Sequence, residues 1–340
     1  MSEVDINQPS PMFRVLSLGA GVQSTALALL SIDGHLPKLD HAIFADTGWE
    51  PQSVYTHLDR LEVELSYHGI ELHRVSAGNI ALDALDALDP EHRFASMPLY
   101  TQEKPQPCTK CKRTGELVVT LDDESTKVVR CARCRGTGTW DGKGMVRRQC
   151  TSEYKLKPIK EKVRELLGAP RVNGKATRVK RGRFVESWVG ISTDEFERIA
   201  PHGVSYMRRV DPLVETLKLS RDQCEAYLAD RWRWPVGKSA CIGCPFHSNA
   251  EWRALRDNEP DAWEAALVFD NAIRDENRHL HMPHLRGVPF LHDDRVPLRE
   301  VDIDRETDNE RRARLQPQLF TLRACNPFDC RSAEYDTVPS

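Results

Sequence analysis

Two C-x-x-C pairs that lie close together give the clearest chemical signal in this sequence. Their four thiols belong to Cys108, Cys111, Cys131 and Cys134. Each pair can sit on one tight turn, and two such turns can enclose a tetrahedral zinc ion. Residues 116–120 and 126–130 between the pairs can form a β-hairpin that turns at 122–123. A redox-active pair of dithiols is the alternative, but the repeated spacing favours structural zinc.

A glycine-rich turn, residues 17–25 (SLGAGVQST), is the second segment whose residues can do chemistry. It lies between an apolar strand and a helix, where backbone N–H groups and the positive helix end can hold phosphate. Ser24 and Thr25 add hydroxyls and can cap the helix. No Lys follows the glycines, so this is not a Walker A loop, and G-x-G-x-x-G is not completed. A tight strand–helix turn without a ligand remains the alternative.

These motifs need a scaffold that positions them. The first three apolar runs, with helical segments between them, imply right-handed crossovers and a parallel sheet. We therefore expect an α/β fold with a doubly wound parallel sheet. The predicted strands are 13–18, 41–45, 71–75, 185–191 and 207–214, and the predicted helices are 24–32, one starting at Pro51, 156–167, 220–232 and 249–275, the last broken near Pro260.

The strand–helix pattern breaks near residue 95, where a polar segment with Gly, Thr and Lys carries the four clustered cysteines. We interpret this segment as an insertion. The predicted organisation is a first half of a nucleotide-binding α/β domain (12–94), an inserted zinc-binding hairpin (95–148), a second half of the α/β domain (149–250) and a helical and irregular C-terminal region (251–340).

Three segments, in chain order, resemble the phosphoadenosine phosphosulfate (PAPS) reductase family of the adenine nucleotide alpha-hydrolase-like (PP-loop) superfamily. The turn at 17–25 is similar to the S-G-G-x-D-S loop of that superfamily. Residues 45–55 (ADTGWEPQSVY) resemble the family's D-T-G…E-T-Y segment, and 190–198 (GISTDEFER) resemble its G-I-R-x-x-E-x-x-R segment. The resemblance covers roughly residues 12–250. It implies a PP-loop or HUP-like fold that binds ATP or PAPS, with magnesium as an accompanying ion.

The resemblance also implies a set of site residues. Those expected to bind the nucleotide are Ser17, Gly19, Gly21, Gln23, Ser24, Thr25, Asp46, Gly48 and Gly190. Those expected to act in catalysis are Ser24, Asp46, Glu195 and Arg198. These residues follow predicted strands, and ligands of open α/β sheets bind outside the carboxyl ends of the strands.

Two departures from the family pattern bear on the reaction. Gln23 stands where ATP-cleaving members carry an Asp near magnesium, and a neutral amide coordinates a hard cation weakly. Gln23 is compatible with the reductase branch, which need not split ATP. True PAPS reductases, however, carry a nucleophilic cysteine in a C-terminal E-C-G-x-H segment, and Cys325 and Cys330 lack that glycine and histidine.

A second set of cysteines consists of Cys150 and the pair Cys241-x-x-Cys244, which Pro245 follows. This set resembles the iron–sulfur ligands of some PAPS-reductase-like and thiolation proteins. A C-x-x-C-P turn aims two thiolates at one point, and three ligands would leave one iron of a [4Fe–4S] cluster open to substrate or sulfide. A second zinc site and plain thiols are the alternatives.

The inserted hairpin has its own resemblance. Residues 131–138 (CARCRGTG) match the C-x-x-C-x-G-x-G unit of DnaJ-type zinc regions, whereas the first unit departs from it at Arg113. Basic residues surround the thiolates, and a basic zinc hairpin suits a nucleic-acid backbone. A second basic run, 171–183, contains six Lys or Arg and no acidic residue. The alternative is that both basic segments are simply solvated surfaces.

Composition limits the protein class. With 40% hydrophobic residues the chain can bury a core, which excludes disorder of the whole chain. A net charge of −3 argues against binding of nucleic acid over the whole surface. The longest apolar run, 26–32, is too short to span a bilayer, and residues 1–11 lack the order of a signal peptide. We expect a soluble, cytoplasmic protein that does not act at a membrane.

The function most consistent with these features is nucleotide-dependent sulfur chemistry, in which ATP adenylates a nucleic-acid substrate (tRNA or DNA) and sulfur then replaces the adenylate. A thiol reductant or a sulfur-donor protein would be a partner. Two alternatives remain: a PAPS or adenylyl-sulfate reductase that forms sulfite, and a non-catalytic nucleic-acid-binding protein with a degenerate nucleotide site.

Overall fold

The computed structural model describes residues 10–86, 97–122, 124–199, 203–233, 236–275, 287–308 and 310–311. Cys325, Cys330 and most of the predicted irregular C-terminal region lie outside the described residues. No helix in the described ranges is long and apolar enough to cross a membrane.

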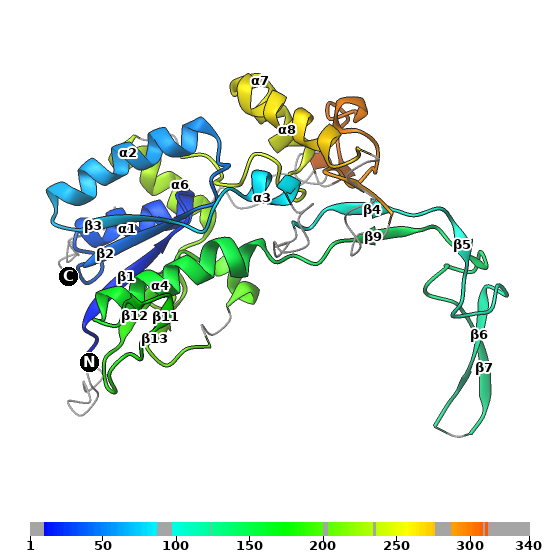
Figure 1. The fold of residues 1–340 in the computed structure, drawn as a ribbon, viewed down its shortest axis with the longest axis horizontal. Coiled ribbons are helices and arrows are strands. Elements are labelled where there is room, and N and C mark those ends of the chain that lie inside the picture. The colour runs from blue at the N-terminus through cyan, green and yellow to red at the C-terminus, as the bar shows by residue number, and fades with distance from the viewer. Residues whose placement is uncertain are drawn as a thin grey trace, which may run out of the picture.

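A five-stranded sheet, parallel throughout, forms the centre of the molecule (Figure 1). Read from β3, its spatial order is β3-β2-β1-β12-β13, which is 3-2-1-4-5 when these five strands are counted along the chain, as in Rossmann-like and HUP-like folds. The predicted α/β fold is confirmed. The strands are β1 (Phe13–Leu18), β2 (His41–Asp46), β3 (Glu71–Ser76), β12 (Val185–Val189) and β13 (Met207–Val210).

Both faces of this sheet are covered by helices, which is why its central strands are apolar on both sides. On one face, Leu16 and Phe44 pack in a core with helices α1, α2 and α6. On the other, Val15 and Ile43 pack against α4, which Figure 1 shows beneath the sheet. These helices are α1 (Val22–Ile32), α2 (Gln52–Tyr67), α4 (Lys157–Leu166) and α6 (Arg221–Tyr227).

Several predicted bounds were wrong for local reasons. The predicted strand 207–214 ends at Val210 because Pro212 opens the short helix α5 (Pro212–Glu215). The predicted helix 220–232 is α-helical only as far as Tyr227 and continues as a π-helical segment, η3 (Leu228–Trp232). Another π-helical segment, η1 (Thr151–Leu156), leads into α4.

The insertion forms an arm that projects from the main body, at the right of Figure 1. At its base, β4 (Tyr100–Gln102) pairs with β9 (Lys143–Met145) and with β14 (Val288–Phe290). Further out, β5 (Gln106–Pro107) pairs with β8 (Thr139–Trp140). The predicted hairpin is confirmed as β6 (Glu116–Thr120) and β7 (Thr126–Arg130), paired antiparallel. We call residues 106–140 the arm.

A separate helical layer covers the base of the arm. The predicted break near Pro260 is confirmed, since α7 (Asn249–Asn258) ends and α8 (Pro260–Ala272) begins there. Trp252 and Phe269 lie in a second apolar core with α3 (Ile80–Asp86), with Leu99 just before β4 and with Leu291. The remaining short elements are the hairpin β10 (Arg171–Val172) and β11 (Lys175–Ala176), and the 3₁₀ segments η2 (Thr193–Arg198) and η4 (Leu298–Glu300).

Candidate functional site

The glycine-rich turn joins β1 to α1 at the carboxyl edge of the sheet. Ser24 closes the turn on itself: its Oγ accepts from the N–H of Gly19 at 3.2 Å and donates to the carbonyl of Gly21 at 3.1 Å. Gly21 is the N-cap of α1 and supplies no side-chain cap, and the first turn of the helix carries no acidic residue. The first N–H groups of a helix lack partners inside it and attract anions. This turn can therefore bind a phosphate group.

Gly190, which follows β12, packs directly against the turn. A Cβ built on Gly190 would lie 2.8 Å from the backbone nitrogen of Ser24 and 2.9 Å from its Cα. Those distances are far below van der Waals contact, so no larger residue fits without moving the backbone. The structure therefore brings the first and third family-like segments together at neighbouring strand ends.

Gln23 connects three parts of the site through its side-chain amide. Its Nε2 donates to Glu195 Oε2 at 3.2 Å and to Ser192 Oγ at 3.4 Å, and its Oε1 accepts from Arg221 Nη1 at 3.2 Å. Glu195 Oε2 is also 2.8 Å from Arg198 Nη1. A carboxylate from the segment after β12 thus lies beside Gln23 at the first turn of α1.

Asp46 fixes the turn that follows β2. One of its oxygens, Oδ1, accepts from the N–H of Gly48 at 2.7 Å and from the hydroxyl of Tyr55 at 2.9 Å. Burial and the bond to Asp46 together raise the pKa of Tyr55 to about 12, so this hydroxyl stays protonated at neutral pH. Gly48 has a φ of +72°, and its carbonyl accepts from Asn79 at 2.6 Å. The turn is therefore held from both sides.

Thr25 and Ser17 contribute to the scaffold around the turn. The Thr25 hydroxyl lies 3.0 Å from His57 Nε2 on α2, and its N–H donates to the carbonyl of Gly21. Thr25 is fully buried, and the contact between its hydroxyl and His57 links α1 to α2. Ser17 lies within β1, paired with Val189 and Ile43.

The Cys241–Cys244 segment folds onto the same edge of the sheet. Cys241 Sγ lies 3.2 Å from Thr47 Oγ1 and donates to Glu50 Oε1 at 3.5 Å. The N–H of Ile242 donates to the carbonyl of Trp49 at 2.9 Å. The backbone nitrogen of Ser239 would lie 3.7 Å from a Cβ built on Gly21. The segment before Cys241 therefore lies beside the glycine-rich turn, and the Cys241 thiol lies at the turn after β2.

Cys150 completes the second set of cysteines but does not close it around a single ion. Burial raises the pKa of Cys241 and Cys244, and the charge of Cys150 acts on Cys244 in the same direction. These three thiols are not among the groups whose ligand atoms all lie within 4.8 Å of one another. A multinuclear cluster holds its thiolates further apart than one ion does, because several iron atoms lie between them. Buried Glu50 also has an oxygen, Oε2, without a hydrogen-bond partner.

The four cysteines of the arm, by contrast, form one compact group. All four are buried, and their sulfur atoms lie within 4.8 Å of one another. The Sγ atoms of Cys108 and Cys131 are 3.8 Å apart, and those of Cys111 and Cys134 are 3.6 Å apart. This cluster can hold zinc or an iron–sulfur centre.

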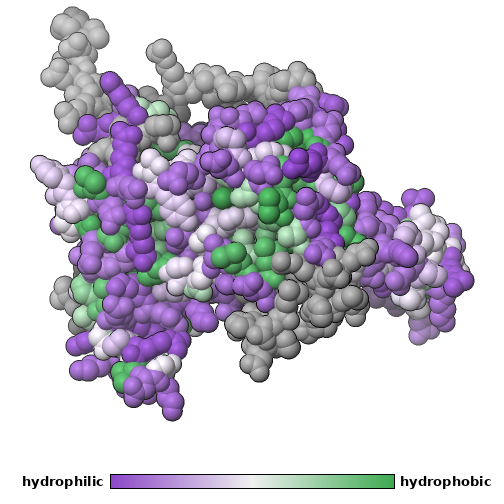
Figure 2. Space-filling view, turned by 45° about the horizontal axis from the view of Figure 1, so that its top comes forward, coloured by the Kyte–Doolittle hydropathy of each residue, from purple (hydrophilic) through white to green (hydrophobic). Residues whose placement is uncertain are grey.

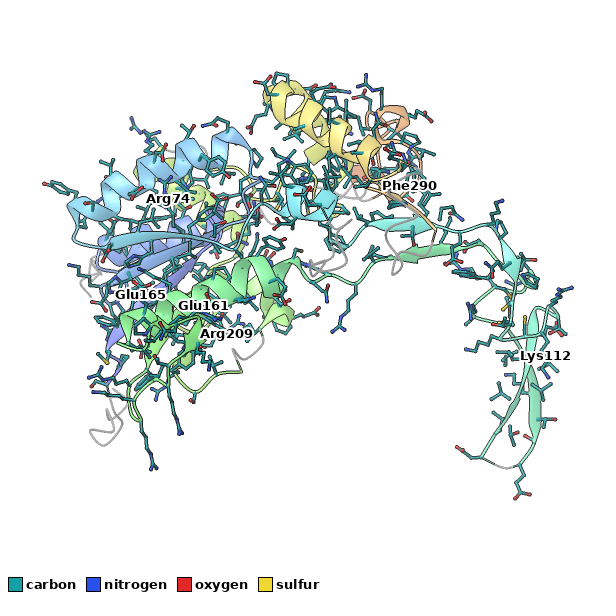
Figure 3. All side chains as sticks on the ribbon, in the orientation of Figure 1. Arg74, Lys112, Glu161, Glu165, Arg209 and Phe290 are labelled. Atoms are coloured by element: carbon teal, nitrogen blue, oxygen red, sulfur yellow. The ribbon has the colours of Figure 1, made fainter. Side chains whose placement is uncertain are left out.

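Basic residues of the arm are exposed around this cluster. Figure 3 shows Lys112 beside the hairpin, and Figure 2 shows mostly hydrophilic side chains on the arm at its right. Arg133 stacks over Trp140 at 5.1 Å. The exposed basic residues are Lys110, Lys112, Arg113, Lys127, Arg130, Arg133 and Arg135. In the second basic run, Arg171 instead pairs with Glu161 of α4 at 2.6 Å.

Reasoning from the sequence missed several residues of the site. Arg221 and His57 bond to the glycine-rich turn from helices far along the chain, and no motif marks them. Glu50 lies in a family-like segment, yet its contact with Cys241 depends on tertiary structure. No family model, no curated protein and no solved structure matches this chain.

Proposed function

We propose that the chain binds an adenine nucleotide at the turn 17–25 and uses it for sulfur chemistry at the adjacent thiols. The support for phosphate binding is the helix N-terminus of α1, uncapped by any side chain, with Gly190 packed against it. Asp46 and Gly48 then border the nucleotide from the next strand end, where ligands of open α/β sheets bind.

One observation carries the sulfur assignment: Cys241 contacts Thr47 and Glu50 at the carboxyl edge of the sheet, and Ser239, two residues earlier, packs on Gly21 of the proposed phosphate turn. Burial raises the pKa of the Cys241 thiol, so in the protein without metal it stays neutral at pH 7, and a bound metal is needed to make it a thiolate. Its position next to a nucleotide site links the two functions.

The proposed reaction has two steps. A substrate oxygen attacks the α-phosphate of ATP, so that an O–P bond forms, the α–β phosphoanhydride breaks and pyrophosphate leaves. A sulfur nucleophile at the oxidation level of sulfide then attacks the activated carbon, the C–O bond breaks and AMP leaves with the oxygen. Neither step changes the oxidation state of carbon or sulfur.

The chain's own residues have distinct roles in this proposal. The α1 N-terminus with Ser24 stabilises the charge on the leaving pyrophosphate. Asp46 orients the nucleotide through the turn after β2. Glu195 offers the carboxylate that Gln23 lacks and is the proposed magnesium ligand, and Arg198 balances the phosphate charge from the substrate side.

The zinc assignment rests on the spacing of the arm's sulfur atoms. Around a zinc ion with Zn–S bonds of about 2.3 Å, tetrahedral geometry separates the sulfur atoms by about 3.8 Å. The arm's sulfur pairs match this separation, at 3.8 and 3.6 Å. Cys150, Cys241 and Cys244 are proposed to hold an iron–sulfur cluster, which when bound would supply sulfide to the site.

The proposed substrate is a nucleic acid held by the arm. Its exposed basic residues and the Arg133–Trp140 pair suit phosphate groups and an unpaired base. The reductase alternative keeps support from Gln23, because its amide is fully engaged and carries no negative charge.

Calorimetric titration of the zinc-loaded protein with ATP and with PAPS tests the nucleotide site. Ser24→Ala should weaken binding at least about tenfold, since it removes the hydroxyl that closes the turn. Ser66→Ala, an exposed serine of α2, is the matched control. Equal affinity in both variants, or no binding of either nucleotide by the wild type, would contradict the proposal.

A further inference from the structure

A second group of ligating side chains lies at the end of the sheet opposite the thiols. His41 is the first residue of β2, and Glu71, the first residue of β3, is its register partner. His73 follows Glu71 by two residues, so both side chains point to the same face of β3. These three residues are thus brought together by neighbouring strands at their amino ends.

The ligand atoms are spaced as a metal ion requires. His41 Nδ1 lies 3.1 Å from His73 Nε2 and 3.6 Å from Glu71 Oε2, and one ligand atom from each residue lies within 4.8 Å of the others. With bonds of about 2.0–2.1 Å, tetrahedral zinc separates nitrogen and oxygen ligands by about 3.4 Å. The two measured separations bracket that value.

The group of His41, Glu71 and His73 is sheltered on the side of its imidazoles and open to solvent on the side of its carboxylate. The imidazoles are sheltered, with side-chain exposures of 14% for His41 and 9% for His73, whereas Glu71 is 66% exposed. An ion could therefore enter from solvent and reach two held nitrogens. The ring of Phe13 packs edge-on against His41, with centroids 5.0 Å apart, and restricts how that imidazole can turn.

Charges from α4 act on this group from the other side. Lys162 lies close enough to repel a cation there, and its Nζ is 2.9 Å from Glu165 Oε1, which offsets part of its charge. Figure 3 shows Glu165 on α4, which packs on this face of the sheet. Asp40, next to His41, adds negative charge.

We propose that His41, Glu71 and His73 form a binding site for a divalent transition-metal ion such as zinc, with a remaining coordination position open to water. Two imidazoles and one carboxylate form a donor set suited to such ions, and three protein ligands leave a site that can accept an outside ligand. This site is independent of the proposed nucleotide and sulfur chemistry, because its residues lie at the other end of the strands.

Cobalt(II) titration separates this site from the thiols. The protein is first loaded with zinc at the arm and then titrated with Co(II) without oxygen. Thiolate ligands produce intense near-ultraviolet charge-transfer bands, whereas nitrogen and oxygen ligands produce only weak visible bands. We expect one further Co(II) per chain with weak visible bands and no new thiolate band.

Three variants decide the assignment. His73→Gln and the exposed Glu71→Gln should each lower the affinity for this Co(II) at least about tenfold. Lys162→Met should raise it, because a repelling charge is removed. His68→Gln, at the C-cap of α2 and outside the group, is the control. The proposal is overturned if the further Co(II) brings a thiolate band, or if Glu71→Gln and Lys162→Met bind it as wild type does.

Discussion

Gly190 packs so closely on Ser24 that a Cβ would lie 2.8 Å from the backbone nitrogen of Ser24. This contact holds the end of β12 against the first turn of α1. It depends on the absence of a side chain at 190 rather than on any polar bond. The shape of the proposed phosphate site therefore rests on one glycine outside the turn itself.

Gly190→Ala should displace the first turn of α1 and weaken nucleotide binding at least about tenfold, while the sheet keeps its fold. Gly237→Ala is the matched control, because a Cβ at 237 meets nothing within 4 Å and its φ is not positive. Titration calorimetry and circular dichroism of both variants provide the check. Unchanged affinity in Gly190→Ala would show that the contact does not shape the site.

Metal removal should unfold the arm and leave the main body intact. The arm's buried cluster consists of its four cysteines with Leu117 packed against them, so little apolar burial replaces a lost ion. After chelation of zinc, trypsin should cleave within 106–140, while the main thermal unfolding transition stays within a few degrees. An arm that still resists trypsin after measured zinc loss would rule out a structural role for the metal.

Charge reversal on the arm should weaken binding to nucleic acid. Lys112→Glu combined with Arg135→Glu should lower affinity for tRNA or single-stranded DNA and reduce the slope of log affinity against log salt by roughly 0.7 for each lost phosphate contact. Arg299→Glu, exposed on the main body, is the control. Equal salt slopes in the two proteins would place the binding surface elsewhere.

Acidification should destabilise the contact between α1 and α2. Burial, with a contribution from Arg60, lowers the pKa of His57 from 6.5. Below pH 6.5 the unfolded chain therefore binds more protons at this residue than the folded chain, so the free energy of unfolding falls as pH falls. Urea unfolding at pH 7.5 and 5.5 measures this change.

His57→Gln keeps a partner for Thr25 but cannot titrate. Its stability should therefore fall less between pH 7.5 and 5.5 than that of the wild type. His68→Gln, at a half-exposed histidine paired with Glu64, serves for comparison. A fall in His57→Gln as large as in the wild type would mean that other groups cause the pH dependence.

The main architecture could be predicted from sequence because its signals are local. Apolar runs such as 13–18 coincide with β1, and the hairpin strands 116–120 and 126–130 match β6 and β7. The C-x-x-C spacing likewise predicted the compact thiol cluster of the arm. Each of these features depends only on residues that lie within a few tens of positions of one another in the sequence.

Features that depend on tertiary contacts could not be predicted. Nothing near Cys241 in sequence indicates Thr47 and Glu50 as its neighbours, and nothing near Gln23 indicates Arg221. The group of His41, Glu71 and His73 is hidden for the same reason, because it needs the register of two strands thirty residues apart. The contact of the Thr25 hydroxyl with His57 Nε2 is likewise indicated by no motif, and its role at the nucleotide stays a prediction.

The most direct test of the central proposal is to incubate the protein, purified without oxygen, with ATP or PAPS, with and without tRNA or DNA, and to assay pyrophosphate, AMP, sulfite and thiolated nucleic acid. Cys241→Ser is assayed beside Cys224→Ser, whose thiol lies buried in the core. We predict pyrophosphate and AMP from ATP, increased by nucleic acid, with thiolated product lost in Cys241→Ser alone. Sulfite from PAPS, or none of these products, would contradict the account.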